Sequence, residues 1–282
     1  MNGLVLEGGG MRGLFSTGVL DAFLKEGVTV DGMVGVSAGA CLCCNYKSRQ
    51  IGRALRYNIL LRNDPKYMSL KSFIKTGDFI GAEYAYHYIP TYVDIFDREA
   101  FAANPMKFTL VCTDVLTGNP IYKQIDEVTD HTLDWIRASA SLPLLSKPVA
   151  LDGYLMLDGG MADAIPLKYW QSQGYDKNIV VLTQPSDYRK KKTGMMPLFK
   201  LFMRKYPAVI EAMAHRHEMY NGQLDYIIEE EKKGKTLLIF PPCKLDIGRV
   251  EQNADKMRAV RQLGEDTAMA MMDRIKDFLK EQ

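Results

Sequence analysis

Short apolar runs alternate along this chain with stretches in which apolar residues recur every three or four positions. The recurring pattern is that of a helix with one buried face, whereas a short apolar run between polar segments predicts a buried strand. The runs predict strands at residues 4–6, 33–36, 108–112, 155–157, 178–183 and 236–240. Strands separated by helices predict the α/β class, with a largely parallel sheet between helical layers and ligands at the carboxyl ends of its strands.

Two longer helical patterns occupy the C-terminal part of the chain. Apolar residues at helical spacing predict a helix over residues 207–232 and a second helical stretch over 253–280 that is interrupted at Gly264. We therefore expect a core over residues 4–170, followed by an extension over 171–282 that completes the sheet and adds helices as part of one unit.

The first predicted strand runs into a glycine-rich loop, EGGGMRG at residues 7–13, and a helical pattern follows it. Gly8, Gly10 and Gly13 have the spacing of a dinucleotide-binding loop, but that motif also needs an acidic residue at the end of the second strand. Asp31 precedes this strand instead. The spacing therefore gives weak support to dinucleotide binding, and a simple tight turn is a further alternative.

We favour a different role for the same loop, as an oxyanion hole. Backbone N–H groups around Gly9, Gly10 and Met11 would approach a developing negative charge without an intervening side chain, aided by the positive end of the following helix. An oxyanion hole needs a nucleophile to serve, and the second predicted strand ends beside one.

A serine stands between two glycines in GVSAG, residues 35–39, directly after that second strand. This is the pattern of a nucleophile elbow, in which a sharp strand-to-helix turn presents the serine hydroxyl. Small neighbours such as Gly35 and Gly39 keep the adjacent chain from blocking it. Ser37 is therefore the candidate nucleophile.

A serine nucleophile needs a base, and an aspartate follows the strand predicted at 155–157. Asp158 precedes Gly159 and Gly160, which permit a close approach of the backbone to the site. An aspartate before glycines is by itself an ordinary turn former, so its role depends on the other motifs.

Taken in order, the glycine-rich loop, the GVSAG elbow and the aspartate–glycine motif resemble the bacterial branch of the patatin-like phospholipase family. ASASLP at residues 138–143 adds to the likeness, because the family has an Ala-Ser stretch ending in proline shortly before its aspartate. Glu7 stands where many members carry aspartate. The resemblance covers residues 4–170 and implies a three-layer fold with a Ser37–Asp158 dyad and no catalytic histidine.

The resemblance further implies hydrolysis of lipid carboxylic esters. Asp158 would accept the hydroxyl proton of Ser37, the serine would attack an ester carbonyl, and water would hydrolyse the acyl-enzyme. Arg12 would orient the loop or meet a lipid phosphate, although a basic residue in a first helical turn is often simply solvated. The alternatives are a soluble short-chain esterase and a catalytically silent lipid-binding module.

Histidines that follow Asp158 would suit a Ser–Asp–His triad instead. His215 and His217 both fall in the helix predicted at 207–232, where His217 lies on the apolar stripe and His215 points away from it. A catalytic histidine is expected on a loop that reaches the nucleophile. We therefore interpret His217 as a hydrogen-bonded core residue.

Composition limits the remaining choices. The 282 residues are 47% hydrophobic, enough for one large core, and the net charge of +2 gives no basis for nucleic-acid binding. Three of the five cysteines crowd residues 41–44, where we expect packed thiols. With no apolar leader and no apolar run of membrane-spanning length, we expect a cytoplasmic protein that needs no metal or cofactor.

One segment suggests peripheral contact with an anionic membrane surface. Residues 189–192 are Arg-Lys-Lys-Lys, and apolar side chains at helical spacing follow over residues 195–206. Such a helix would insert Leu198, Phe199 and Phe202 into a lipid surface that attracts the four cations. A solvated charge run followed by an ordinary packed helix explains the pattern equally well. No pattern indicates the oligomeric state.

Overall fold

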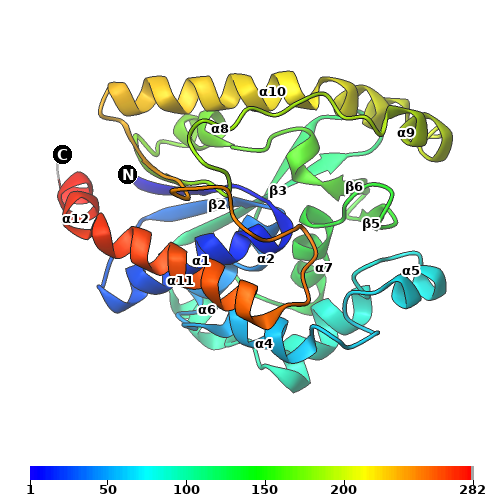
Figure 1. Cartoon of the computed structure of the whole chain (residues 1–282), viewed down its shortest axis with the longest axis horizontal. Coiled ribbons are helices and arrows are strands. Elements are labelled where there is room, and N and C mark those ends of the chain that lie inside the picture. The colour runs from blue at the N-terminus through cyan, green and yellow to red at the C-terminus, as the bar shows by residue number, and fades with distance from the viewer. Residues whose placement is uncertain (281–282) are drawn as a thin grey trace.

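One mixed sheet forms the centre of the protein in the computed structural model, which describes residues 1–280 (Figure 1). Its strands are β1 (Asn2–Leu6), β2 (Gly32–Val36), β3 (Lys107–Asp114), β4 (Pro120–Gln124), β5 (Val149–Leu151), β6 (Tyr154–Asp158), β7 (Lys177–Val181) and β8 (Thr236–Ile239). Their order is β5-β6-β3-β2-β1-β7-β8, with β4 also paired to β3. The neighbouring strands β3, β2, β1, β7 and β8 are parallel to one another, whereas β4, β5 and β6 pair antiparallel.

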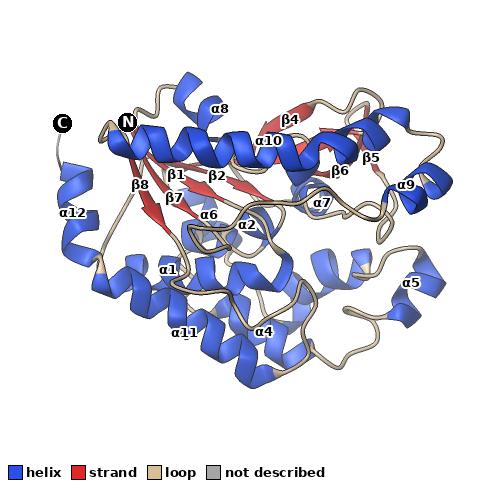
Figure 2. Ribbon diagram, turned by 45° about the horizontal axis from the view of Figure 1, so that its top comes forward, coloured by secondary structure: helices blue, strands red, loops and turns tan. Residues whose placement is uncertain are grey.

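Helices flank the sheet on both faces (Figure 2). They are α1 (Gly13–Lys25), α2 (Ala38–Cys41), α3 (Cys44–Lys47), α4 (Arg53–Leu61), α5 (Leu70–Thr76), α6 (Arg98–Ala103), α7 (Asp130–Ser139), α8 (Leu167–Ser172), α9 (Met196–Phe202), α10 (Pro207–Lys232), α11 (Ala254–Ala270) and α12 (Met272–Lys280). Short 3₁₀ turns, η1 (Gly10–Arg12) and η3 (Gly159–Met161), and a π-helix, η2 (Tyr84–Val93), complete the set in the described residues. The predicted α/β class is confirmed.

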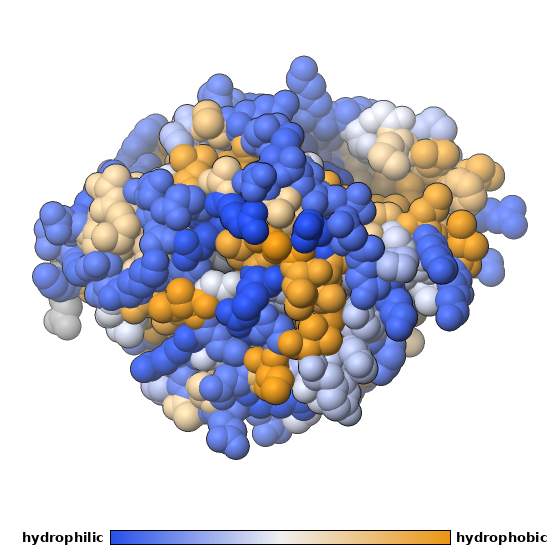
Figure 3. Space-filling model, turned by 60° about the horizontal axis from the view of Figure 1, so that its bottom comes forward, coloured by the Kyte–Doolittle hydropathy of each residue, from blue (hydrophilic) through white to orange (hydrophobic). Residues whose placement is uncertain are grey.

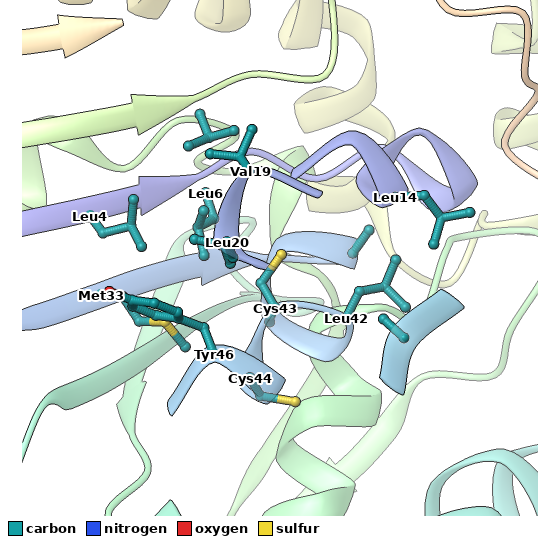
Figure 4. Close-up of a cluster of buried hydrophobic side chains, with 14 of the residues drawn as sticks. Leu4, Leu6, Leu14, Val19, Leu20, Met33, Leu42, Cys43, Cys44 and Tyr46 are labelled. Atoms are coloured by element: carbon teal, nitrogen blue, oxygen red, sulfur yellow. The ribbon is translucent and has the colours of Figure 1, made fainter. Parts of the chain in front are cut away.

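Alternate residues of the central strands point to opposite faces of the sheet, as the pleat requires. Leu4 and Leu6 of β1 and Met33 of β2 belong to one buried cluster with α1, shown in Figure 4. Val5 and Val34 belong to a second cluster, with α8 and α10 on the other face. Each central strand is therefore buried on both sides, which is why it reads as a continuous apolar run.

All six strands predicted from apolar runs are present, and β7 ends at Val181, two residues earlier than expected. Two further strands were not predicted, because neither carries a buried apolar run. Every residue of β4 is at least partly exposed, and β5 has only three residues. The cysteines make no disulfide, and Cys43 and Cys44 are packed in the first cluster (Figure 4).

The two C-terminal helical patterns have different outcomes. The helix predicted over residues 207–232 is confirmed as α10, but the interruption predicted at Gly264 is wrong. The break lies at Met271, between α11 and α12, and Gly264 is inside α11. A Cβ atom on Gly264 would lie 2.0 Å from the backbone oxygen of Phe15, so glycine allows α11 to pack closely against α1. None of the described helices combines the length and apolarity that crossing a bilayer requires.

Candidate active site

Ser37 follows β2 at the carboxyl end of the parallel strands, in a strained backbone conformation. Its φ of 55° and ψ of −120° lie outside the regions that non-glycine residues ordinarily occupy. A Cβ atom on Gly39 would lie 2.4 Å from the backbone oxygen of Leu6, so glycine lets the turn pack against β1. The local geometry matches the elbow that the sequence predicts.

A second serine, Ser139, holds this turn in place by hydrogen bonds. The Ser37 N–H donates to Ser139 Oγ over 3.1 Å, and Ser139 Oγ donates in turn to the backbone oxygen of Val111 over 2.7 Å. Ser139 is fully buried at the end of α7. The Ala-Ser stretch in the sequence therefore connects the elbow to β3.

Asp158 is the last residue of β6, which pairs antiparallel with β3. Its N–H donates to the backbone oxygen of Ser141 over 2.8 Å, and its own backbone oxygen accepts from Thr113 Oγ1 over 2.8 Å. The Gly160 N–H donates to Asp158 Oδ1, also over 2.8 Å. Backbone and carboxyl group are thus both held in place. One carboxylate oxygen remains for chemistry.

That remaining oxygen, Asp158 Oδ2, is buried and has no hydrogen-bond partner of ordinary geometry among the described residues. Burial raises the pKa of Asp158 above its usual value, against the opposing influence of the nearby Ser37 hydroxyl, the charge of Arg216 and the Gly160 N–H. A raised pKa makes a carboxylate a stronger base. The structure thus brings Ser37 and Asp158, 121 positions apart in sequence, to one site.

The glycine-rich loop lies directly against the elbow. Glu7 is buried beneath it and accepts from the N–H and Oγ1 of Thr183 and from the hydroxyl of Tyr220, over 2.7 to 3.0 Å. This side chain therefore ties the loop to the segment that follows β7 and to α10. The other motif glycines lie where a Cβ atom would come within 3.1 Å of a neighbouring residue, and these are Gly8, Gly13, Gly35, Gly159 and Gly160.

The predicted oxyanion donors are not equivalent. The Met11 N–H already donates to the backbone oxygen of Arg249 over 3.1 Å. Among residues 1–280, the N–H groups of Gly9 and Gly10 have no backbone acceptor, and both residues line the hollow beside Ser37. Gly10 has a φ of +61°, and a Cβ atom there would lie 2.5 Å from the same Arg249 oxygen. Gly9 and Gly10 are thus the donors available to a ligand.

Asp31 lies far from this loop in the sheet. It precedes β2, at the amino edge of the parallel strands, where its Oδ2 accepts from the Asn2 N–H over 2.7 Å. The loop and Ser37 lie at the opposite, carboxyl edge. The acidic residue that a dinucleotide site would need is therefore not beside the glycines.

Basic side chains crowd the site, and sequence reasoning assigned only Arg12 to it. Arg12 is half-buried rather than solvated, and its Nε has no hydrogen-bond partner among the described residues. Arg216 Nε donates to the backbone oxygen of Gly160 over 2.6 Å. Lys190 and Arg249 line the same hollow. Arg216 could have been found, because it interrupts the apolar stripe of α10 four residues before Tyr220.

The basic run does not form the outward patch that the sequence suggests. Arg189 pairs with Asp225 at 3.2 Å, and Lys190 turns inward over the ring of Tyr220. Residues 191 and 192 remain exposed. In α9, Phe199 is buried, so its predicted insertion into lipid is wrong, whereas Leu198 and Phe202 are 44% and 67% exposed.

A mostly apolar pocket of about 150 Å³ opens on the other side of Ser37. Side chains from α2, α4, η2 and α7 form much of its wall, among them Cys41, Tyr57, Ile89, Leu133 and Ile136. The half-buried Cys41 lines this pocket and also packs against the first cluster. Ser37 stands between an apolar pocket and a cationic hollow.

Neither candidate histidine lines the hollow or the pocket beside Ser37. His215 is exposed and pairs with Glu211 and Glu218 on its own helix. His217 is only half-buried, with a buried Nδ1 that lacks a partner in the described chain, so its interpretation as a hydrogen-bonded core residue is wrong. Arg216 between them points to the site.

Replacing His215 or His217 with glutamine is therefore expected to leave ester turnover within about tenfold, roughly 1.4 kcal/mol of barrier. Steady-state rates of the two purified variants on a nitrophenyl ester check this. A loss as large as that of a nucleophile variant would contradict a histidine-free mechanism.

Family models match two parts of this chain. The model of the patatin-like phospholipase family matches residues 4–169, and a model described as a domain of unknown function (DUF6363) matches residues 206–280. Among solved structures, VipD from Legionella pneumophila aligns with a TM-score of 0.49 at 11% identity, over 97% of this chain and 67% of that one.

Several relatives are similar at modest identity. The uncharacterized protein YjjU of Escherichia coli (strain K12) is 27% identical over 86% of this chain and 69% of its own length. An uncharacterized NTE family protein of Mycobacterium tuberculosis is 27% identical over 65% of this chain and 49% of its own length. Lysophospholipase nte1 of Aspergillus oryzae is 25% identical over 62% of this chain and 11% of its own length.

The first family match spans more than half of the residues and includes the glycine-rich loop, the elbow and the aspartate that meet at this site. The chain therefore belongs to the patatin-like phospholipase family.

Proposed function

We propose that this protein is a serine acyl hydrolase that cleaves the carboxylic ester of a phospholipid or lysophospholipid. One observation carries the proposal. Ser37 stands on a strained elbow, shares a hollow with the buried carboxylate of Asp158, and also lines a mostly apolar pocket. A lysophospholipase among the relatives supports the same reaction class.

The reaction follows from the position of each group. Ser37 Oγ attacks the ester carbonyl carbon and passes its proton to Asp158 Oδ2, while the N–H groups of Gly9 and Gly10 stabilise the oxyanion. The ester bond then breaks, and the departing alkoxide takes the proton from Asp158. Water attacks the acyl-enzyme, gives a proton to Asp158, and releases the fatty acid as Ser37 recovers its hydrogen. The balance is one ester and one water to one acid and one alcohol.

The apolar pocket favours a lipid over a small ester. Each methylene group that moves from water into such a pocket contributes about 0.8 kcal/mol, so a long acyl chain binds far better than an acetyl group. A pocket of about 150 Å³ holds several methylene groups, more than an acetyl ester provides. We therefore expect kcat/KM to rise with acyl length.

A fluorophosphonate probe tests the proposal without a chosen substrate. We expect the probe to label Ser37, as located by peptide mapping, and a series of nitrophenyl esters from C2 to C16 to show increasing kcat/KM. Labelling with turnover of C2 and C4 esters only would favour the short-chain esterase. No labelling and no turnover of any ester would favour a silent lipid-binding module.

Two short helices give this enzyme an apolar surface for contact with lipid. Hydrophobic side chains are exposed on α5 and α9, which lie at the same end of the molecule in Figures 1 and 2. They are Leu70, Ile74, Leu198, Leu201 and Phe202. Figure 3 shows hydrophobic side chains gathered at this end. Lysines 71, 75 and 200 are exposed beside them, as an interfacial contact with anionic lipid requires.

Replacing both Leu198 and Phe202 with serine is expected to weaken binding to anionic phospholipid vesicles at least about fivefold, because two apolar groups no longer enter the surface. Vesicle co-sedimentation measures this, and Met269→Ser, which changes an exposed residue on α11, is the control. Equal vesicle binding by both variants and the unchanged protein would show that α9 does not contact lipid.

A further inference from the structure

Four basic side chains surround the hollow beside Ser37, and we call them the cationic chamber: Arg12, Lys190, Arg216 and Arg249. They come from η1, the basic run, α10 and the loop after β8. The hollow has a volume of about 40 Å³ and shares Ser37 with the apolar pocket. A ligand at Ser37 would therefore meet apolar groups on one side and cations on the other.

The chamber carries more positive charge than its own carboxylates balance. Its lining residues include only two carboxylates, those of Glu7 and Asp158. Glu7 is occupied by Thr183 and Tyr220, and Asp158 Oδ1 accepts from Gly160. None of the four cations forms a salt bridge within the described chain, and Arg12 Nε is buried without a partner. Half-buried cations that outnumber the carboxylates around them are costly, and a bound anion would relieve that cost.

The cations are held in position rather than loosely arranged. The Lys190 N–H donates to Asn221 Oδ1 over 2.8 Å, and Asn221 Nδ2 donates to the Lys190 backbone oxygen over 3.0 Å. Lys190 Nζ lies 4.2 Å from the ring centre of Tyr220. Arg216 is fixed by its hydrogen bond to Gly160. A preorganised set of donors binds an anion without a further ordering cost.

The burial and the positive charges of the chamber affect the pKa of Lys190. Burial and the charges of Arg216, Arg249 and Arg12 lower its pKa to about 8, although Glu7 acts in the opposite direction. An anion in the hollow would favour the charged lysine again, by the same interaction that would bind the anion.

We propose that the cationic chamber binds the phosphate of a lipid whose ester lies at Ser37 and whose acyl chain enters the apolar pocket. The inference rests on the proposed function and names its substrate class. Glycerol separates the ester carbonyl of a lysophospholipid from its phosphate by only a few bonds, so neighbouring sites suit the two groups. Arg12, Arg216 and Arg249 supply planar donors that match phosphate oxygens.

The same chamber disfavours a choline headgroup. Four cations around a small hollow outnumber its two carboxylates and would repel a quaternary ammonium, and Lys190 already lies over the ring of Tyr220, the aromatic residue among its lining residues. A terminal phosphate presents only negative oxygens. The enzyme therefore prefers phosphomonoester and other anionic lysophospholipids over choline lysophospholipids and neutral monoacylglycerols.

The test compares 1-oleoyl lysophosphatidic acid, 1-oleoyl lysophosphatidylcholine and monooleoylglycerol below their critical micelle concentrations. We expect kcat/KM to be at least about tenfold higher for lysophosphatidic acid than for either of the others, a difference of roughly 1.4 kcal/mol. Lys190→Gln and Arg249→Gln should each lower this ratio about tenfold. Lys191→Gln, the same charge change at the exposed neighbouring residue, should leave the ratio unchanged.

Binding to the Ser37→Ala protein, measured by calorimetry, separates the two proposals. If lysophosphatidic acid binds and Lys190→Gln weakens that binding, the chamber is supported even when no ester is cleaved. In that case only the proposed hydrolase function is refuted. Ester cleavage with equal kcat/KM for the three lipids would overturn the chamber and leave the function standing. Inorganic phosphate that binds as tightly as lysophosphatidic acid would overturn the assignment to a lipid headgroup.

Discussion

Ser37→Ala and Asp158→Asn are each expected to lower ester turnover by about 10⁴-fold or more, with the fold intact. Ser37 is the only hydroxyl on the elbow, and Asp158 supplies the one buried carboxylate oxygen without a hydrogen-bond partner in the described chain. A nucleophile and its base act as a unit, so the double variant should be scarcely slower than either single variant. Steady-state kinetics and circular dichroism measure both properties.

Matched controls for this pair lie on the surface. Ser172→Ala and Asp176→Asn make the same changes at exposed positions and should leave turnover unchanged. Because burial raises the pKa of Asp158 and the base must be ionised, kcat/KM should fall as pH decreases, starting above the ordinary value of 3.8. A folded Ser37→Ala protein that retains turnover would refute the assigned nucleophile.

Gly9→Ala is expected to reduce kcat by about 10²–10³-fold, the loss typical of one oxyanion donor in an acyl-transfer enzyme, roughly 2.7–4 kcal/mol. A Cβ atom at Gly9 would lie 2.7 Å from Thr183 Oγ1, the hydroxyl that helps to anchor Glu7. The loop or the Thr183 side chain that anchors Glu7 beneath it must shift, and we expect the loop N–H groups to turn away from the developing oxyanion. The effect should appear in kcat more than in KM, as measured with a nitrophenyl ester.

Gly222→Ala provides the control, because nothing lies within 4 Å of a Cβ atom at that helical position. It should leave kcat unchanged. An unchanged kcat in Gly9→Ala as well would remove the glycine-rich loop from the mechanism, and the loss of a bound nucleotide in that variant would return the dinucleotide interpretation to consideration.

The buried parts of the fold were predictable because burial leaves a local trace in sequence. The central strands are packed on both faces, so each reads as an apolar run, whereas β4 and β5 leave no such run. Gly264 misled the helix prediction because a glycine reads as a break. Its role is to accommodate the backbone of Phe15, which is distant in sequence.

The residues of the site likewise fall into those that a local sequence motif predicts and those that only the fold brings together. Ser37, Asp158 and the glycine-rich loop belong to short contiguous motifs, so their positions could be read directly. Lys190 belongs to a basic run that predicts membrane contact instead, Arg249 belongs to no motif, and only the packing of α10 and of the loop after β8 brings them to the elbow. The hydrogen bond from the Met11 N–H to the Arg249 backbone oxygen depends only on the path of the backbone, which no pattern of side chains reveals.

The close packing of α1 against α11 has a consequence for the order of events during synthesis. Phe15 and Gly18 are made early, whereas Arg261 and Gly264, which pack against them, are made about 240 residues later. We propose that the core over residues 4–170 and the extension over 171–282 fold as one unit. A growing chain that already contains Ser37 and Asp158 still lacks Lys190, Arg216 and Arg249 of the cationic chamber, and it lacks α11, which packs against α1. Long-range contacts of this kind form late. We expect the nascent chain to reach its final packing only after α11 leaves the ribosome.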